Sequence, residues 1–124
     1  MNLVKMIEDF HTKFELTYTG APRNLESELS EFRRLFMKEE LDEYRESVFV
    51  GDLEGQLDAL VDLVYVALGT AYLQGFDFNE AFRRVHEANM KKVRARQKSD
   101  SKRASSYDVV KPVGWTPPDL SDLT

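Results

Sequence analysis

The stretch that most constrains the fold is the run "LDALVDLVYVALGTAYL", residues 57–73, in which nearly every side chain is apolar or small. A helix of this composition is expected to be buried on most sides. Its only charges are Asp58 and Asp62, which lie one turn apart on one face. Burying an unpaired carboxylate costs several kcal/mol, so these two need a cation or must give up their charge. An arginine or lysine from another helix could supply it, and so could a metal ion.

Three other segments show the spacing of amphipathic helices, and no segment shows the alternation of a strand. The sequence predicts helices over residues 3–16, 25–49, 53–73 and 77–97, with short connections. The expected fold is therefore all-α, an antiparallel four-helix bundle. Residues 1–98 are predicted to form this helical domain. Residues 99–124 are polar and then proline-rich, which predicts a linker and an extended C-terminal tail in which Trp115 is an anchor.

The composition narrows the class of function. The chain has no cysteine and two histidines, so thiolate chemistry is excluded and little remains for a soft-metal site. Its formal net charge of −5 argues against a general nucleic-acid binder. The first residues, "MNLVKMIEDF", have no apolar core of signal-peptide length, and a cytoplasmic location is expected.

The second predicted helix changes character along one face. Its apolar stripe is formed by Leu25, Leu29, Phe32 and Phe36. Continued at 100° per residue, this stripe reaches positions 39, 40 and 43, and all three are glutamate. Either the helix leaves the core here and the acids are solvated, or something positive compensates their mutual repulsion.

A reversal of direction at the turn near residues 51–55 places these glutamates beside Asp58 and Asp62. The fourth helix is expected to bring a polar continuation of its own stripe to the same end, formed by Asn89, Lys92 and Arg96. Clustered carboxylates suit Mg²⁺ or Mn²⁺, with two or more ions per site. The amide and cationic groups suit phosphate oxygens. Glu39 is the candidate to deprotonate a water in metal-assisted hydrolysis of a phosphoanhydride.

Three motifs, "EELDE", "DALVD" and "HEANMKKV", resemble those of the MazG-like all-α nucleoside triphosphate pyrophosphohydrolases. This superfamily includes phosphoribosyl-ATP pyrophosphohydrolases, dCTP pyrophosphatases and dimeric dUTPases. The resemblance covers roughly residues 25–98. It implies metal binding by Glu40, Glu43 and Asp62. The family's E-x-x-D pair is interrupted at Ala59, and Asp58 stands in for the missing glutamate.

The resemblance implies the reaction and the assembly as well. Water attacks the α-phosphate, releasing a nucleoside monophosphate and pyrophosphate, with Asn89 and Lys92 on the phosphates. The tail is similar to that of compact, often phage-encoded members, which suggests deoxynucleotides, with dGTP the first candidate, and the host cytoplasm as location. A homo-oligomer is implied, a tetramer as a dimer of dimers. Base or sugar contacts are assigned to the first helix and the following loop, namely Phe10, His11, Phe14 and Tyr18. Apart from the resemblance, the tail anchored by Trp115 makes Lys111 a candidate to contact a substrate phosphate.

Two other functions stay open. A di-iron carboxylate bundle needs two Glu-x-x-His motifs, and only Glu8-x-x-His11 is present. A non-enzymatic helical adaptor or nucleic-acid-binding bundle would use the basic run "KKVRARQKSDSKR", which has no interleaved aromatic residue.

Overall fold

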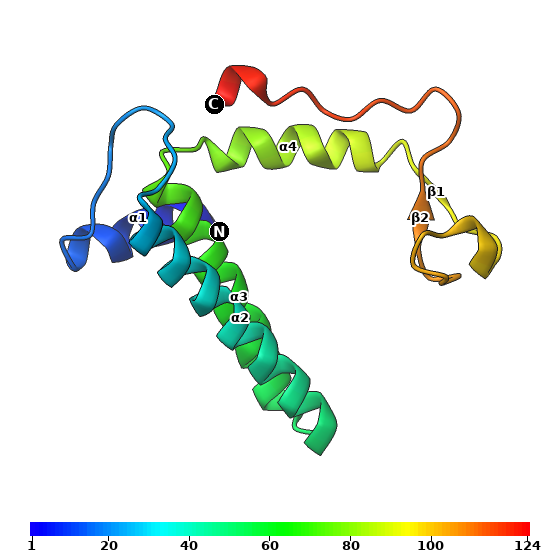
Figure 1. Cartoon of the computed structure of the whole chain (residues 1–124), viewed down its shortest axis with the longest axis horizontal. Coiled ribbons are helices and arrows are strands. Elements are labelled where there is room, and N and C mark those ends of the chain that lie inside the picture. The colour runs from blue at the N-terminus through cyan, green and yellow to red at the C-terminus, as the bar shows by residue number, and fades with distance from the viewer. The chain divides into compact units, whose positions relative to one another are not determined.

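The computed structural model describes all 124 residues and contains four α-helices, two short 3₁₀ turns and one two-stranded sheet (Figure 1). The predicted all-α class is confirmed. The chain divides into two compact units, Met1–Phe78 and Asn79–Leu123. The first contains α1 (Leu3–Lys13), α2 (Ser27–Val50) and α3 (Leu53–Leu73). The second contains nearly all of α4 (Phe78–Asn89), the hairpin strands β1 (Val93–Arg94) and β2 (Val109–Val110), and the tail.

The helices α2 and α3 form a long antiparallel hairpin, visible in Figure 1, because a two-residue turn joins them. Gly51 ends α2 with a φ of 71°, a left-handed conformation that glycine adopts at little cost. Asp52 then caps α3, its carboxylate accepting a hydrogen bond of 3.0 Å from the backbone N–H of Gly55. The predicted bounds of α3 are correct, and those of α2 differ by one or two residues at each end.

The interface within the hairpin contains small residues of α3 and one buried cation of α2. Ala59, Val66 and Gly69 are buried on α3. Arg33 crosses from α2, where its Nη2 donates to the carbonyl of Val66 at 2.9 Å and its Nε to the hydroxyl of Thr70 at 3.0 Å. The guanidinium has no carboxylate partner, and burial lowers its pKa. Arg33 thus fastens the two helices in register through polar contacts.

The helix α1 packs on the C-terminal half of α3 through Ile7 and His11, which are four residues apart and both buried. The His11 ring lies 4.5 Å from that of Tyr72, and its Nδ1 is 2.8 Å from the carbonyl oxygen of Leu16. The loop after α1 returns to the end of α3, where Arg23 donates from Nε to the carbonyl of Leu73. A cation at this position satisfies a terminal carbonyl and complements the helix dipole.

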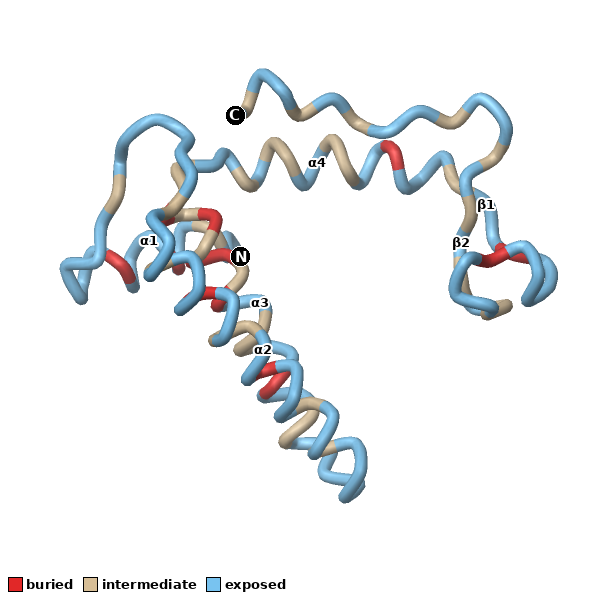
Figure 2. Tube along the Cα trace, in the orientation of Figure 1, coloured by how far each residue is buried: buried red, intermediate tan, exposed pale blue.

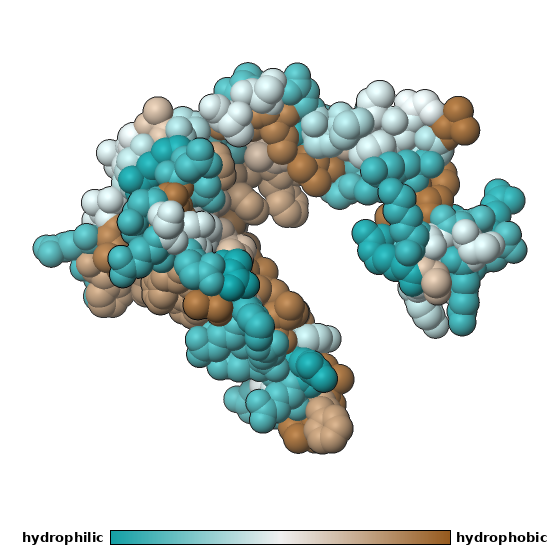
Figure 3. Space-filling model, viewed as in Figure 1, coloured by the Kyte–Doolittle hydropathy of each residue, from teal (hydrophilic) through white to brown (hydrophobic).

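The expectation that α3 is buried on most sides is wrong for the single chain. Leu57, Leu60, Val61, Val64 and Tyr65 are exposed, together with Leu3 and Met6 of α1, and we call these seven residues the apolar face. Buried residues are few along the hairpin in Figure 2, and Figure 3 shows hydrophobic side chains along one of its edges to the tip. By length and composition alone, α3 is also long and apolar enough to cross a membrane. The core helix of a soluble protein meets the same two criteria.

The fourth helix ends at Asn89, eight residues earlier than predicted. The chain leaves α4 through two tightened i→i−3 bonds, from the N–H of Lys91 and of Lys92. Val93 then pairs with Val110 in the β1–β2 hairpin, so the chain continues as a β-strand and not as a helix. Lys92 and Arg96 therefore do not continue the stripe of α4.

The tail runs back along α4 within the second unit. Trp115 donates from Nε1 to the carbonyl of Ala88 at 2.6 Å, which confirms its anchoring role. Further along, the carboxylate of Asp122 accepts hydrogen bonds from Nη1 and Nη2 of Arg84, at 2.6 and 3.0 Å. Arg84 also donates to Glu80 one turn earlier in α4. Two contacts about one turn apart on α4 thus hold the extended segment in place.

We expect Gly69→Ala to lower the melting temperature. An alanine Cβ at this position would lie 2.6 Å from Arg33 Nη2 and 3.0 Å from His11 Nε2. Relief requires displacing the guanidinium from the Val66 carbonyl, a loss of about 1–3 kcal/mol that exceeds the ~1 kcal/mol gain in helix propensity. Thermal unfolding by circular dichroism measures the change. In an Arg33→Ala background the same substitution should cost much less, and an equal cost in both backgrounds would contradict this account.

Candidate functional site

Three carboxylates of the α2–α3 hairpin converge. Glu40 and Glu43 are one turn apart on α2, and Asp62 faces them from α3. One oxygen of each lies within 4.8 Å of the others, and we call these three residues the carboxylate cluster. The cluster arises because Glu40 lies seven residues after Arg33, and therefore on the same buried face of the helix.

Glu40 is the most constrained member of the cluster. Its side chain is only 7% exposed, and its Oε2 is buried without any hydrogen-bond partner. Burial, a hydrogen bond with Glu43 and the charges of Glu43, Asp62 and Glu39 raise its pKa to about 7. An orphaned buried carboxylate oxygen costs about 1–3 kcal/mol or more, so a partner that the chain itself does not provide is expected there.

Burial also raises the pKa of Asp62, and the charges of Asp58 and Glu43 add to the shift. Neither lysine nor arginine pairs with any of the five predicted acids: the ion pairs of the chain involve other carboxylates. The buried cation of this hairpin, Arg33, binds Val66 and Thr70 instead. A compensating arginine or lysine, one of the two alternatives drawn from the sequence, is thus absent from the structure.

The other two predicted acids lie beside the cluster. Glu39 and Asp58 are exposed, and each is near enough for its charge to raise the pKa of a cluster member. Ala59, where the resembled family has glutamate, is 1% exposed in the hairpin interface. Asp42 points away from the cluster, forming an exposed ion pair with Lys38.

The donor set fits a hard divalent cation. Three carboxylates with an unsatisfied buried oxygen, and two more carboxylates beside them, provide the oxygen ligands that Mg²⁺ and Mn²⁺ prefer. No histidine belongs to the carboxylate cluster, and His11 is instead buried against Tyr72. The second Glu-x-x-His motif that a di-iron bundle requires is missing from the sequence as well.

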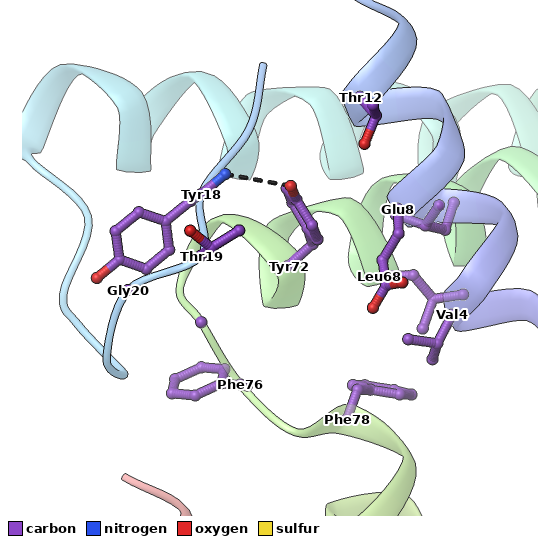
Figure 4. A pocket seen from close by; sticks show the side chains of 12 residues that line it. Val4, Glu8, Thr12, Tyr18, Thr19, Gly20, Leu68, Tyr72, Phe76 and Phe78 are labelled. Carbon is purple, nitrogen blue, oxygen red and sulfur yellow. Dashed lines mark hydrogen bonds between the residues drawn. The ribbon is translucent and has the colours of Figure 1, made fainter. Parts of the chain in front are cut away.

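A pocket of about 410 Å³ lies between α1, the following loop and the end of α3. Its walls are aromatic and aliphatic, with Glu8, Thr12 and Thr19 as polar groups (Figure 4). Tyr18 and Tyr72 meet at its rim, where the backbone N–H of Tyr18 donates to the Tyr72 hydroxyl at 3.2 Å. Along the α3 axis, Tyr72 lies ten residues beyond Asp62, a rise of about 15 Å.

Of the four residues predicted to contact base or sugar, Tyr18 lines this pocket. Phe10 and Phe14 lie elsewhere, with ring centroids 4.9 Å apart, and Phe10 also packs edge-on against Tyr65. His11 is 3% exposed and serves the packing of α1 on α3.

The predicted phosphate-binding residues belong to the second unit. Asn89 is the last residue of α4, and Lys92 precedes β1. Arg96 is exposed in the loop that joins β1 to β2. Lys92 and Lys111 each lie over the ring of Trp115, with Nζ 5.1 Å from its centroid.

Reasoning from the sequence missed Arg33 and Gly69. The interval of seven residues between Arg33 and Glu40 is a signal for a shared face. The apolar stripe alone does not reveal this face, because Phe32 on that stripe is 56% exposed.

Comparison with known proteins identifies the family. The sequence model of the phosphoribosyl-ATP pyrophosphohydrolase family matches residues 7–89, which include α2, α3 and the whole carboxylate cluster. No protein with a curated description matches the chain. Because the match covers more than half of the chain, it confirms the resemblance to all-α pyrophosphohydrolases, and the chain belongs to the phosphoribosyl-ATP pyrophosphohydrolase family, whose members are hydrolases acting on phosphoanhydride bonds.

Proposed function

We propose that this protein is a divalent-metal-dependent nucleoside triphosphate pyrophosphohydrolase, converting a (d)NTP and water to a (d)NMP and pyrophosphate. The observation that carries the proposal is the buried, unpartnered Oε2 of Glu40 within the carboxylate cluster. A cation there would offset the burial and the repulsion that raise the pKa of Glu40. The family match supports the same class of reaction.

The residues divide the work as follows. Glu40, Glu43 and Asp62 hold the metal, with Asp58 available beside them for a second ion. When bound, Mg²⁺ or Mn²⁺ supplies Lewis acidity toward phosphate oxygens and lowers the pKa of water. Glu39 accepts a proton from the attacking water. The water oxygen bonds to the α-phosphorus, the bond from that phosphorus to the bridging oxygen breaks, and pyrophosphate leaves with that oxygen.

Substrate contacts complete the proposal. Asn89, Lys92 and Arg96 are assigned to phosphate oxygens by the chemistry of their side chains. Phe10, His11, Phe14 and Tyr18 are proposed for base or sugar, and among these the pocket beside Tyr18 favours Tyr18. Deoxynucleotides are the proposed class, with dGTP tested first. The protein is proposed to be an enzyme of the phage type that acts in the host cytoplasm.

A panel of the standard NTPs and dNTPs with Mg²⁺ or Mn²⁺, scored for pyrophosphate release, tests the reaction. We expect turnover of at least one nucleotide, lost on chelation by EDTA. Turnover of none would refute the proposal for these substrates.

Charge-neutral variants of the carboxylate cluster test the residues. We expect Glu40→Gln and Asp62→Asn each to abolish pyrophosphate release, because each removes a metal ligand while keeping shape and volume. The matched control is Asp42→Asn, the same chemical change on an exposed residue of α2, which should retain activity. Circular dichroism checks that all three variants fold. Full activity in either cluster variant would remove that residue from the site.

The raised pKa of Glu40 predicts how stability depends on pH without metal. Below its ordinary value of 4.5 the group is protonated in both folded and unfolded states. As pH rises from there to about 7, only the unfolded state releases the proton, so the folded state loses stability over this window. We expect the melting temperature of wild type to fall relative to Glu40→Gln across this range, and Mg²⁺ to restore it above pH 7. Parallel profiles for the two proteins would contradict the assignment.

We also propose that the apolar face joins two copies of the chain within a homo-oligomer, and the proposed assembly is a tetramer built as a dimer of dimers. The groove in this face has a volume of about 520 Å³ and almost wholly apolar walls. A face of this kind on a family enzyme is more costly to leave in water than to bury against itself. A two-fold axis through it would make the interface self-complementary.

Substitution at the centre of the apolar face tests this assembly. We expect wild type to be a dimer or larger by light scattering coupled to gel filtration, and Val64→Lys to shift it toward monomer. Val109→Lys on β2 is the matched control, because the two valines are almost equally exposed, at 48% and 49%. The assembly is refuted if wild type is monomeric, or if both variants dissociate equally.

A further inference from the structure

Positive charge is concentrated in the β1–β2 hairpin and its loop, over residues 91–111. This stretch contains eight lysines and arginines and two aspartates, a formal excess of six positive charges. The rest of the chain has the opposite balance, with nine lysines and arginines against twenty acidic residues. The net charge of −5 therefore hides a strongly basic segment, which Figure 1 shows beyond the C-terminal end of α4.

The two aspartates of this segment hold the loop together. Asp108 pairs with Arg103 at 2.6 Å and accepts a hydrogen bond from the Ser101 hydroxyl at 2.7 Å. Asp100 accepts hydrogen bonds from the backbone N–H groups of residues 96 and 97, at 3.2 and 3.3 Å. These contacts fold the loop and leave its other cations without a carboxylate partner.

Three cations of the hairpin and its loop are exposed and form no ion pair, namely Arg94, Lys98 and Lys102. A surface that serves solubility alone has charges of both signs interspersed. The dipole of α4 accounts only for the lysines directly after it. Exposed charges act over about 8 Å at physiological salt, so a polyanion beside the hairpin responds to the local excess and not to the net charge of the chain.

Tyr107 adds an aromatic ring to this basic segment. It is 90% exposed and takes part in none of the ring contacts of the chain. Its backbone is fixed in a turn, because its N–H donates to the Ser105 hydroxyl at 3.1 Å. Nε of Arg94 donates to the carbonyl of Ser106, which belongs to the peptide bond preceding Tyr107. The fold thus holds a guanidinium next to the backbone that carries an exposed ring.

We propose that the β1–β2 hairpin docks single-stranded nucleic acid. Arg94, Lys98 and Lys102 contact backbone phosphates, and an unpaired base stacks on Tyr107. Such a surface binds many sequences, because every base has a flat face. These four residues are separate from those proposed for the substrate, so the nucleic acid is a second ligand and its binding does not depend on the proposed reaction.

Two other polyanions match the charge less completely than a single strand does. An acidic peptide offers carboxylates but no bases to stack on the ring. An anionic membrane is bound more firmly where apolar side chains insert beside the cations. Apart from Tyr107, the loop between the strands has only Ala95 and Ala104 as apolar residues, which is little area for insertion.

Fluorescence anisotropy of a labelled oligothymidylate of about 20 nucleotides, titrated with the full-length protein, tests the inference. EDTA in the buffer removes contacts that a metal at the carboxylate cluster could mediate. We expect saturable binding that weakens as salt rises, because neutralised phosphates release counterions. An RNA strand of the same length should bind alike, and a duplex more weakly because its bases are already stacked.

A triple variant tests the cations. We expect Arg94→Gln, Lys98→Gln and Lys102→Gln together to weaken binding by about tenfold or more and to reduce the slope of log affinity against log salt by about two.

The matched control removes one arginine and two lysines from exposed positions of the first unit, by Lys5→Gln, Lys13→Gln and Arg45→Gln. It changes the net charge of the chain by the same amount, so it should retain most of the affinity. Circular dichroism checks that both triple variants fold.

Tyr107→Ala should weaken binding by about fivefold or more through the loss of stacking, and Tyr107→Phe should retain it. The inference is overturned if the oligonucleotide does not bind, if the two triple variants lose affinity equally, or if Tyr107→Ala binds like wild type. Equal or tighter binding to polyglutamate or to phosphatidylserine vesicles would overturn it as well, and would assign the hairpin to that partner.

Discussion

The structure of the first unit depends on the contact between α2 and α3. That interface contains two ionisable side chains of α2, Arg33 and Glu40, and they differ in whether their polar atoms find hydrogen-bond partners. Arg33 finds a carbonyl and a hydroxyl on α3, whereas one oxygen of Glu40 finds no partner. Small residues of α3 make this possible, because Gly69 leaves the space that the guanidinium occupies. The interface therefore combines a polar fastening with an unsatisfied acceptor two helical turns away.

This asymmetry connects stability with function. A buried carboxylate among other carboxylates is costly, and its raised pKa records that cost. Replacing Glu40 by an apolar residue would remove the cost but also the ligand that we propose for the metal. Local conflicts of this kind are expected at functional sites, where a fold carries a destabilising group that a ligand later satisfies. The exposed apolar face of α3 is a second conflict, which burial against another protein surface would resolve.

The sequence was sufficient where one local signal dominated. The turn at Gly51 and Asp52, the apolar run of α3 and its end at Leu73 all follow from local chemistry, and the structure agrees with them. The convergence of Glu40, Glu43 and Asp62 was also predictable, since it requires only helix periodicity and a short turn.

The predictions that were wrong or missing depend on contacts between residues distant in sequence, or on the surroundings of the chain. The end of α4 depends on Val93 pairing with Val110, seventeen residues later, which periodicity in the helix cannot reveal. The burial of Arg33 depends on a glycine of another helix. The exposure of α3 depends on what surrounds the chain, because an apolar residue gives the same signal whether it is buried within one chain or between two.

The early end of α4 changes how phosphate recognition can be organised. On a continuous helix, Lys92 would share its face with Asn89 and Arg96, and the tail would be free to diverge. Because the chain turns into the β1–β2 hairpin instead, the register set by the Val93–Val110 and Arg94–Val109 pairs, continued by one residue, places Lys111 opposite Lys92. The hydrogen bond from Trp115 to α4 then holds both lysines over one ring. Two positive charges held near one ring repel each other in the free protein, and the phosphate groups of the proposed substrate would relieve that repulsion. The cluster of negative charges in the first unit follows the same logic with the signs reversed: in both places the fold holds groups of like charge together, and the partner that we propose is of the opposite charge.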